Sequence, residues 1–326
     1  MIFTRNSNLN DSVFGASYEP ICKVIESKAE AWKKEAPSRL IFNMEKSKHY
    51  AERMTGMTGM DGFKPVPNGG GAPKDMMQES YSKAFVHHTW KDSFELDKES
   101  IDDAVTINLK KKPQAFIDGF YRTRELFAAT LLNGAIGNTS VAFKGSTFDT
   151  TAADGLSMFN TAHTSKLGYG VQSNAFANPF SVDDLGLVAT AMQNYKGDND
   201  EKLAVKPDTI IIPNIATLKN AVFAAIGSDK DPDTANNGYN YQCGLWNVII
   251  NPYWDTTSPY WIVMSSDYNK NYGGAVWFDR MELEVKASED PDTWNMKWTG
   301  MARFTASFFD WRAFAVGGYA SGSTLS

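Results

Sequence analysis

Apolar residues recur at helical spacing in two long segments of the chain. From Ser17 to Ala36 they mark one face of a helix. A second, mostly helical pattern runs from Asp97 to Asn133 and is strongest between Gln114 and Leu132, and Pro113 is expected to interrupt or begin this helix. At about 1.5 Å of rise per residue, a helix of this length projects as a rod. We therefore predict a long helical beam in the first half of the chain.

Strand-like patterns occupy other parts of the chain. Apolar residues between Phe85 and Leu96 suggest strand character, and further strands are expected at Ala275 to Asp279 and Met281 to Ala287. From Trp294 to Tyr319 apolar and polar residues alternate over an unusually long run, which is typical of a strand with one buried face. A single strand of that length is expected to span more than one lobe.

Helices and strands alternate between Ser181 and Asn269. The Ser181 hydroxyl can cap a helix while Asp184 stands three places on, an arrangement that leads into a helix from Leu185 to Tyr195. The elements expected after it are strands at 206–213, 246–251 and 260–264 and a helix at 215–226. This alternation predicts a compact α/β lobe.

The stretch from Met54 to Lys83 is crowded with Gly, Pro and Met and has no sustained period, so it is predicted to be a long loop. Loops beyond about 12 to 15 residues are uncommon inside compact domains and are usually functional or disordered. The flexible apolar side chains expected to contact a partner here are those of Met57, Met60, Phe63, Met76, Met77 and Tyr81. A floppy linker is the alternative interpretation.

The first fourteen residues form an Asn-rich segment that cannot cover a core of its own. Such a terminal arm normally frays unless something else holds it, for example a neighbouring subunit. We expect Phe3, Arg5 and Phe14 to make these contacts between subunits.

Composition and charge exclude several classes of function. With 326 residues, of which 42% are hydrophobic, the chain can bury a large core in one or two domains. The formal net charge of -6 argues against tight binding along a nucleic-acid backbone. The sequence has no apolar run of the roughly 20 residues that cross a bilayer and no secretion signal, so we expect no membrane partner and synthesis in the cytoplasm. Cys22 and Cys243 are expected to be buried free thiols rather than a disulfide or a zinc site.

No spacing typical of a catalytic or metal site occurs, so we predict no enzyme activity, no cofactor and no metal. The four histidines are His49, His87, His88 and His163. Alternation along a strand would send the rings of His87 and His88 to opposite faces. The run Asp229, Asp231, Asp233 is similar to a calcium loop, but Thr234 replaces the required glycine. The run from Lys110 to Lys112 either faces nucleic acid or is a solvated helix end, and we favour the second interpretation.

Three segments resemble the major capsid proteins of tailed bacteriophages with the Hong Kong 97 fold, most of all the Mu-like prophage major head subunits. They are Gly155 to Thr164, with its Met-Phe followed by Ala-His; the strand Val205 to Pro213 between two helices; and the terminal strand from Met301 to Tyr319. Each motif alone is loose, and their order along the chain carries the resemblance.

The resemblance implies an α+β fold with an N-terminal arm, an extended loop, a peripheral domain with a long spine helix, and an axial α/β domain. The implied divisions are the N-terminal arm and helix at 1–53, the extended loop at 54–84, the peripheral domain at 85–180, the axial domain at 181–270, and returning strands at 271–326 that end in the axial domain. In this family the extended loop lies over a neighbour, and axial domains meet around the centres of hexamers and pentamers.

The function implied by the resemblance is that of a structural subunit. Many copies would assemble in the host cytoplasm into the icosahedral shell of the virion, which encloses the phage genome. A scaffold, a portal and decoration proteins are the expected further partners, with weak, non-specific contact to packaged DNA. The chain departs from the self-cleaving members because no long charged helical region precedes the arm, which implies a separate scaffold or a trimmed product.

Two alternative functions remain open at this point. The same fold builds encapsulin-like bacterial compartments, which enclose a cargo enzyme instead of DNA. An aromatic-rich hydrolase, with a cleft built from some of the nine Trp residues, is the second alternative.

Overall fold

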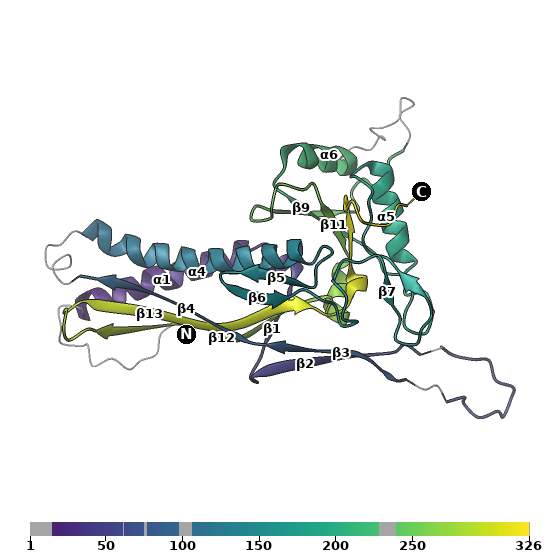
Figure 1. Ribbon diagram of the computed structural model, residues 1–326, viewed down its shortest axis with the longest axis horizontal. Coiled ribbons are helices and arrows are strands. Elements are labelled where there is room, and N and C mark those ends of the chain that lie inside the picture. The colour runs from purple at the N-terminus through teal and green to yellow at the C-terminus, as the bar shows by residue number, and fades with distance from the viewer. Residues whose placement is uncertain (1–14, 61, 75–76, 98–105, 228–238, 326) are drawn as a thin grey trace.

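The computed structural model describes residues 15–60, 62–74, 77–97, 106–227 and 239–325, without the side chains of 15–21, 33–35 and 106–110. The described part contains two four-stranded sheets and three two-stranded ones. Figure 1 shows an elongated limb, built on the first sheet, and a lobe that rises from one end of it around the second. We call these parts the peripheral lobe and the axial lobe.

The peripheral lobe consists of a sheet with the strand order β1-β12-β13-β4 and two long helices. Its elements are β1 (Asn43–Lys46), β4 (His88–Leu96), β12 (Ala275–Glu289), β13 (Met296–Phe308), α1 (Gly15–Glu35) and α4 (Thr106–Gly134). The sequence predictions of both long helices are confirmed. Pro113, however, neither begins nor interrupts α4: it lies inside the helix with its ring buried. Packing against α1 and the sheet outweighs the one backbone hydrogen bond that a proline removes.

The predicted alternation along the terminal strand is confirmed for residues 296–304 of β13, whereas Thr305 and Ser307, predicted on the polar side, are buried. Met296, Trp298 and Phe304 are buried, whereas Lys297 between them is exposed. The Trp298 ring stacks on Phe94 of β4 with 6.0 Å between ring centroids. The buried face of the sheet is therefore an aromatic layer that holds α4.

The prediction of one strand from Trp294 to Tyr319 is wrong, because this run holds two strands. The 3-10 turn η1 (Trp311–Ala313) separates β13 from β14 (Phe314–Gly317), and the two strands belong to different sheets. The Asp310 side chain accepts a hydrogen bond from the backbone N–H of Arg312 at 3.0 Å and so caps this turn. Conversely, the two strands expected between Ala275 and Ala287 are a single strand, β12, with irregular register near Met281.

The axial lobe contains the second sheet, in the order β10-β9-β11-β14, with α5 and α6 packed on it. Its elements are α5 (Val182–Gln193), β9 (Thr209–Pro213), α6 (Ala216–Gly227), β10 (Asn247–Asn251), β11 (Trp261–Met264) and α7 (Ser266–Tyr272). Ser181 caps α5 as predicted, since its hydroxyl oxygen accepts from the Asp184 N–H at 3.0 Å. One continuous hydrophobic core runs through both lobes and includes Trp277 as well as Trp261.

Strands β2 (Ala51–Met57) and β3 (Glu79–Val86) form an antiparallel hairpin that projects from the body. The prediction of a long loop from Met54 to Lys83 is therefore wrong at both ends, where the chain forms strands. These strands are made by backbone pairing with each other, and their apolar residues show no regular spacing in the sequence. We call β2, β3 and the residues between them the extended hairpin.

The short elements that complete the fold are α2 (Ser38–Ile41), β5 (Ser140–Phe143), β6 (Ser146–Asp149), β7 (His163–Thr164) and β8 (Val171–Gln172). Within the described ranges, no helix is long and apolar enough to cross a membrane.

Candidate functional site at the base of the extended hairpin

The foot of the extended hairpin is fixed to the peripheral lobe by Lys83. This ammonium group lies 2.8 Å from the Asp149 carboxylate and donates to the Ser307 hydroxyl at 2.8 Å and to the Thr151 carbonyl. Burial lowers the pKa of Lys83, although the Asp149 charge opposes this effect. Two residues on, the Phe85 ring packs against Phe278 of β12 with 5.3 Å between ring centroids.

Further along, the hairpin touches the axial lobe through residues 194–203, which we call the α5 loop because they follow that helix. The Ser80 hydroxyl donates to the Asp198 carboxylate, and the Asn199 side-chain amide donates to the Met60 carbonyl at 3.2 Å. Ser165 and Lys166 reach Asp198 from the β7–β8 hairpin. The extended hairpin is thus tied to both lobes.

Asp198 is in turn held by Arg312, which belongs to η1, where the chain passes from one sheet to the other. Arg312 Nη2 lies 3.0 Å from Asp198 Oδ1, and its Nε donates to the Lys196 carbonyl at 3.0 Å. Asp310 pairs with the same guanidinium at 3.4 Å and accepts from the Tyr268 hydroxyl at 2.9 Å. Burial disfavours the charged guanidinium, but Asp310, Tyr268 and Asp198 outweigh it and raise the pKa of Arg312.

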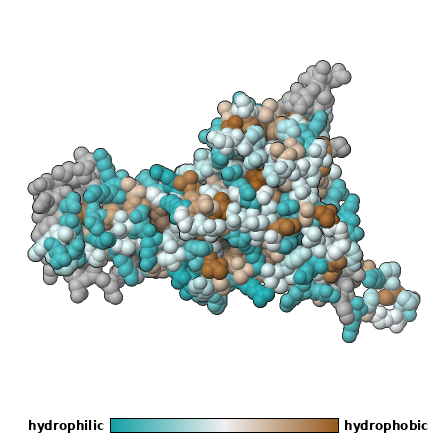
Figure 2. All heavy atoms as spheres, in the orientation of Figure 1, coloured by the Kyte–Doolittle hydropathy of each residue, from teal (hydrophilic) through white to brown (hydrophobic). Residues whose placement is uncertain are grey.

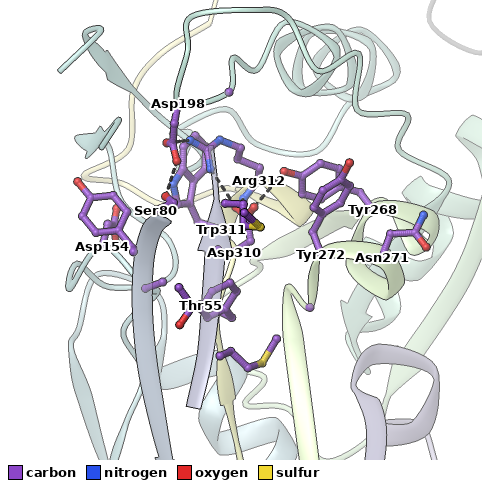
Figure 3. Close-up of a pocket in the computed structure, with 18 of the residues that line it drawn as sticks. Thr55, Ser80, Asp154, Asp198, Tyr268, Asn271, Tyr272, Asp310, Trp311 and Arg312 are labelled. Atoms are coloured by element: carbon purple, nitrogen blue, oxygen red, sulfur yellow. Dashed lines mark hydrogen bonds and ion pairs between the residues drawn. The ribbon is translucent and has the colours of Figure 1, made fainter. Parts of the chain in front are cut away.

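A pocket of about 420 Å³ lies between the extended hairpin and the body. Figure 3 shows Thr55 and Ser80 on hairpin strands along one side and Tyr268, Asn271 and Tyr272 on the other. The Arg312 network closes the end of the pocket nearest the α5 loop. The hairpin therefore crosses a hollow and is held on both sides of it.

Most of the apolar residues predicted to contact a partner are exposed. Met57, Met60 and Met77 are all roughly half exposed or more, and Phe63 is fully exposed. The Tyr81 ring is partly buried: Lys166 Nζ lies 4.9 Å from its centroid, and its hydroxyl lies 3.4 Å from that of Thr164. Met76 and the arm residues Phe3, Arg5 and Phe14 lie outside the described residues. Among the described residues of this set, Met57, Met60, Phe63 and Met77 are thus open to solvent.

The residues that hold the hairpin were missed at the sequence level. Ser80, Asp198 and Arg312 are more than 100 residues apart from one another in sequence, so no spacing motif could connect them. The one signal in the sequence was the pair Lys83 and Phe85, two residues apart in a strand. A single Lys on the same side of a strand as an aromatic residue can indicate a buried cation.

The environments of His163, His87 and His88 are structural. His163 is fully buried: Nδ1 lies 2.7 Å from Asp154 Oδ2, Nε2 lies 3.2 Å from Asn174 Oδ1, and the ring stacks on Trp311 at 4.3 Å. Both ring nitrogens are engaged and neither can reach a substrate. His87 and His88 have separate environments, as predicted, although His87 lies just before β4: its Nε2 contacts the Ser47 hydroxyl at 2.8 Å, whereas His88 packs on Phe148.

The described residues contain no group of three metal-ligating side chains. The proposed calcium run at Asp229, Asp231 and Asp233 lies outside them. Cys22 and Cys243 were expected to be buried, but both are partly exposed.

The comparisons with known proteins agree with this architecture. A family model for phage capsid protein matches residues 80–317, well over half of the chain. No curated protein matches the chain. Similar solved structures include one from Mycobacterium phage Patience, at 9% identity, covering 94% of this chain and 89% of that one with a TM-score of 0.52. Another is the capsid structure of cyanophage P-SCSP1u, at 9% identity, covering 87% of each chain with a TM-score of 0.51. A third is the capsid of a native GTA particle, at 14% identity, covering 88% and 90% with a TM-score of 0.51.

At these low identities the similar structures show only the fold, which is the Hong Kong 97-like capsid fold. Membership of the family is shown by the match to the family model. The finer kinship with Mu-like prophage head subunits is not confirmed by these matches. The match to a phage family favours a phage shell over the encapsulin-like compartment and the hydrolase. The chain belongs to the phage capsid protein family and is a major capsid shell protein.

Proposed function

We propose that each subunit joins the shell by placing its extended hairpin over a neighbouring copy, through Met57, Met60, Phe63, Met76, Met77 and the open part of Tyr81. The single observation that carries this proposal is the full exposure of Phe63 on a hairpin that projects from the body. Large apolar side chains gathered on one projecting segment indicate an interaction site rather than a solvated surface. The N-terminal arm, with Phe3, Arg5 and Phe14, adds a second contact to another neighbour.

The axial lobe supplies a further contact between copies around hexamer and pentamer centres. Its helix α6 supports this role because the fully exposed side chains along it carry no charge, and its one lysine, Lys219, is partly buried and donates to the Asn214 side chain at 2.8 Å. The exposed side chains are those of Ala216, Thr217, Asn220, Ala221, Phe223 and Ala224. Figure 2 shows pale and brown atoms gathered over α6. Helices that face only water normally have a charged or polar outer side.

The mechanism is geometric rather than catalytic. Several modest contacts per subunit, repeated by symmetry, combine into a shell far stronger than any one of them. Residues 54–84 act as the extended loop, 85–180 as the peripheral domain and 181–270 as the axial domain, and residues 271–326 return through the peripheral domain and end in the axial domain. The arm and first helix occupy 1–53.

Other partners follow from the same role. Assembly in the host cytoplasm is expected to involve a scaffold, a portal and decoration proteins. Contact with packaged DNA is weak, since the net charge is -6 and Lys112, in the one short basic run, already donates to the Glu95 carbonyl at 2.9 Å.

The test is to replace residues 62–74, the projecting part of the hairpin, with a two-glycine link. We expect a folded subunit, by circular dichroism, that no longer forms particles in electron microscopy. Substitution of the exposed Tyr50 by Ser, outside the projecting part, is the matched control and should leave assembly intact. Normal particles from the shortened hairpin would refute the role assigned to it.

A further inference from the structure

The extended hairpin is attached to the two lobes by different kinds of contact. At its foot, the side chain of Lys83 is only 8% exposed and makes three polar contacts, while Phe85 lies in a small hydrophobic cluster with Phe278. Towards its tip it is held to the α5 loop by the Ser80–Asp198 hydrogen bond and by the Asn199–Met60 contact. The foot is packed and buried, whereas the second attachment is polar and consists of few bonds.

The second attachment depends on Arg312. Asp198 is nearly buried, with 7% of its surface exposed, and its carboxylate divides its oxygens between Arg312 and Ser80. Arg312 also holds the Lys196 carbonyl, so it fixes the α5 loop at two points. A buried carboxylate in this position needs its cation, because an unpaired charge away from water is costly.

The pocket between these attachments gives the hairpin room to change direction. On the hairpin side the pocket is lined by Met54, Thr55 and Gly56, and Met54 rests against Gly273, where a Cβ atom would lie 2.6 Å from the methionine methyl. Part of β2 therefore borders a hollow of about 420 Å³ instead of a packed core. The paired strands are also irregular here, between Thr55 and Met57.

We infer that Arg312 is the positioning residue of the extended hairpin: through Asp198 and Ser80 it ties the direction of the hairpin to the axial lobe, while Lys83 and Phe85 act as the pivot. A shift of the axial lobe then moves the α5 loop and, with it, the hairpin that reaches the neighbouring copy. This inference rests on the proposed function of the hairpin but concerns the isolated subunit.

The test is amide hydrogen exchange on the full-length protein, with every variant kept in the same assembly state. In Ser80→Ala we expect exchange at residues 77–81 to accelerate at least ten-fold, while residues 84–86 at the foot keep their protection. Ser80→Thr retains the hydroxyl and should behave as the wild type. Arg312→Lys should accelerate exchange at 77–81 and also at 196–200.

The double variant Ser80→Ala/Arg312→Lys distinguishes two explanations. Either Arg312 acts on the hairpin through the Asp198–Ser80 contact, or each substitution destabilises the hairpin independently. If Arg312 acts through Ser80, the double variant should exchange at 77–81 no faster than the faster of the two single variants. Unchanged exchange in Ser80→Ala, an equal acceleration at the foot, or additive effects would each overturn the inference. Because Ser80→Ala removes one oxygen atom, this arm of the test stands even if Arg312→Lys fails to fold. The assembly of the variant lacking 62–74 tests the proposed function separately.

Discussion

Lys83 Nζ and Asp149 Oδ2 lie 2.8 Å apart at the foot of the extended hairpin, and the lysine is the buried partner of the two. Replacing Lys83 by Met keeps the apolar length of the side chain but leaves the Thr151 carbonyl and the Ser307 hydroxyl without their donor. We expect the free energy of unfolding to fall by about 1–3 kcal/mol, since Asp149 is half exposed and stays hydrated. Urea denaturation measures this change.

Lys297→Met is the matched control for Lys83→Met. Lys297 pairs with Glu95 at 3.2 Å, but both side chains are about half exposed. Exposed ion pairs contribute little, so the unfolding free energy should change by no more than about 0.5 kcal/mol. Equal effects in the two variants would show that burial of Lys83 is not what matters.

Acidification should destabilise the junction between the extended hairpin and β4. Burial is the main reason that the pKa values of His87 and His88 lie below the usual value of about 6.5. The charges of Arg280 and Arg303 lower the pKa of His87 further, whereas those of Glu52 and Asp279 raise it. The unfolded chain then binds more protons than the folded one just below the usual value, so stability falls as the pH drops through 6.5. We expect a lower Tm at pH 5.5 than at pH 7.5.

The variant His88→Phe keeps the ring contact with Phe148 and cannot gain a proton. Its Tm should depend less on pH across this window than that of the wild type. An unchanged pH dependence in both His88→Phe and His87→Gln would contradict the assignment to these two rings.

Gly317→Ala should be strongly destabilising because the fully buried Trp261 leaves no room for a side chain. An added Cβ atom would lie 2.2 Å from a carbon of the rigid indole ring. Overpacking of this kind costs about 1–3 kcal/mol or more, and thermal denaturation should report it. Gly71→Ala is the control: nothing lies within 4 Å of the added atom, so its Tm should stay within a degree or two of the wild type, about ±0.5 kcal/mol.

A charge on the outer side of α6 should block assembly without unfolding the subunit. Ala221 is exposed, so Ala221→Glu adds no strain, but the carboxylate would be buried wherever α6 packs against another copy. We expect a normal circular dichroism spectrum and few or no particles by light scattering. Ala31→Glu, on the exposed side of α1 among charged residues, should assemble normally. Full assembly of Ala221→Glu would exclude α6 from the contacts between copies.

Helices and strands whose buried face shows up as a regular spacing of apolar residues were predictable from the sequence. The stripe from Gln114 to Leu132, the cap at Ser181 and the alternation over residues 296–304 of β13 all appear where the pattern placed them. The family resemblance, which rested on the order of such parts, is confirmed by the family match.

Elements fixed by distant contacts could not be predicted. Strands β2 and β3 owe their form to pairing across a gap of more than 20 residues, and α7 is too short to show a period. The break at Trp311 depends on the change from one sheet to another, which a continuous apolar run conceals. Ser80, Asp198 and Arg312 come from three remote segments, and only the folded chain brings them together.

The passage of β13 through η1 into β14 has a mechanical consequence for a subunit of a shell. One covalent backbone belongs to both sheets, so tension applied to either lobe is borne by peptide bonds within a few residues of Trp311. Peptide bonds do not slide or peel as packed surfaces do. Under strain, the seams between copies should therefore yield before a subunit is pulled in two.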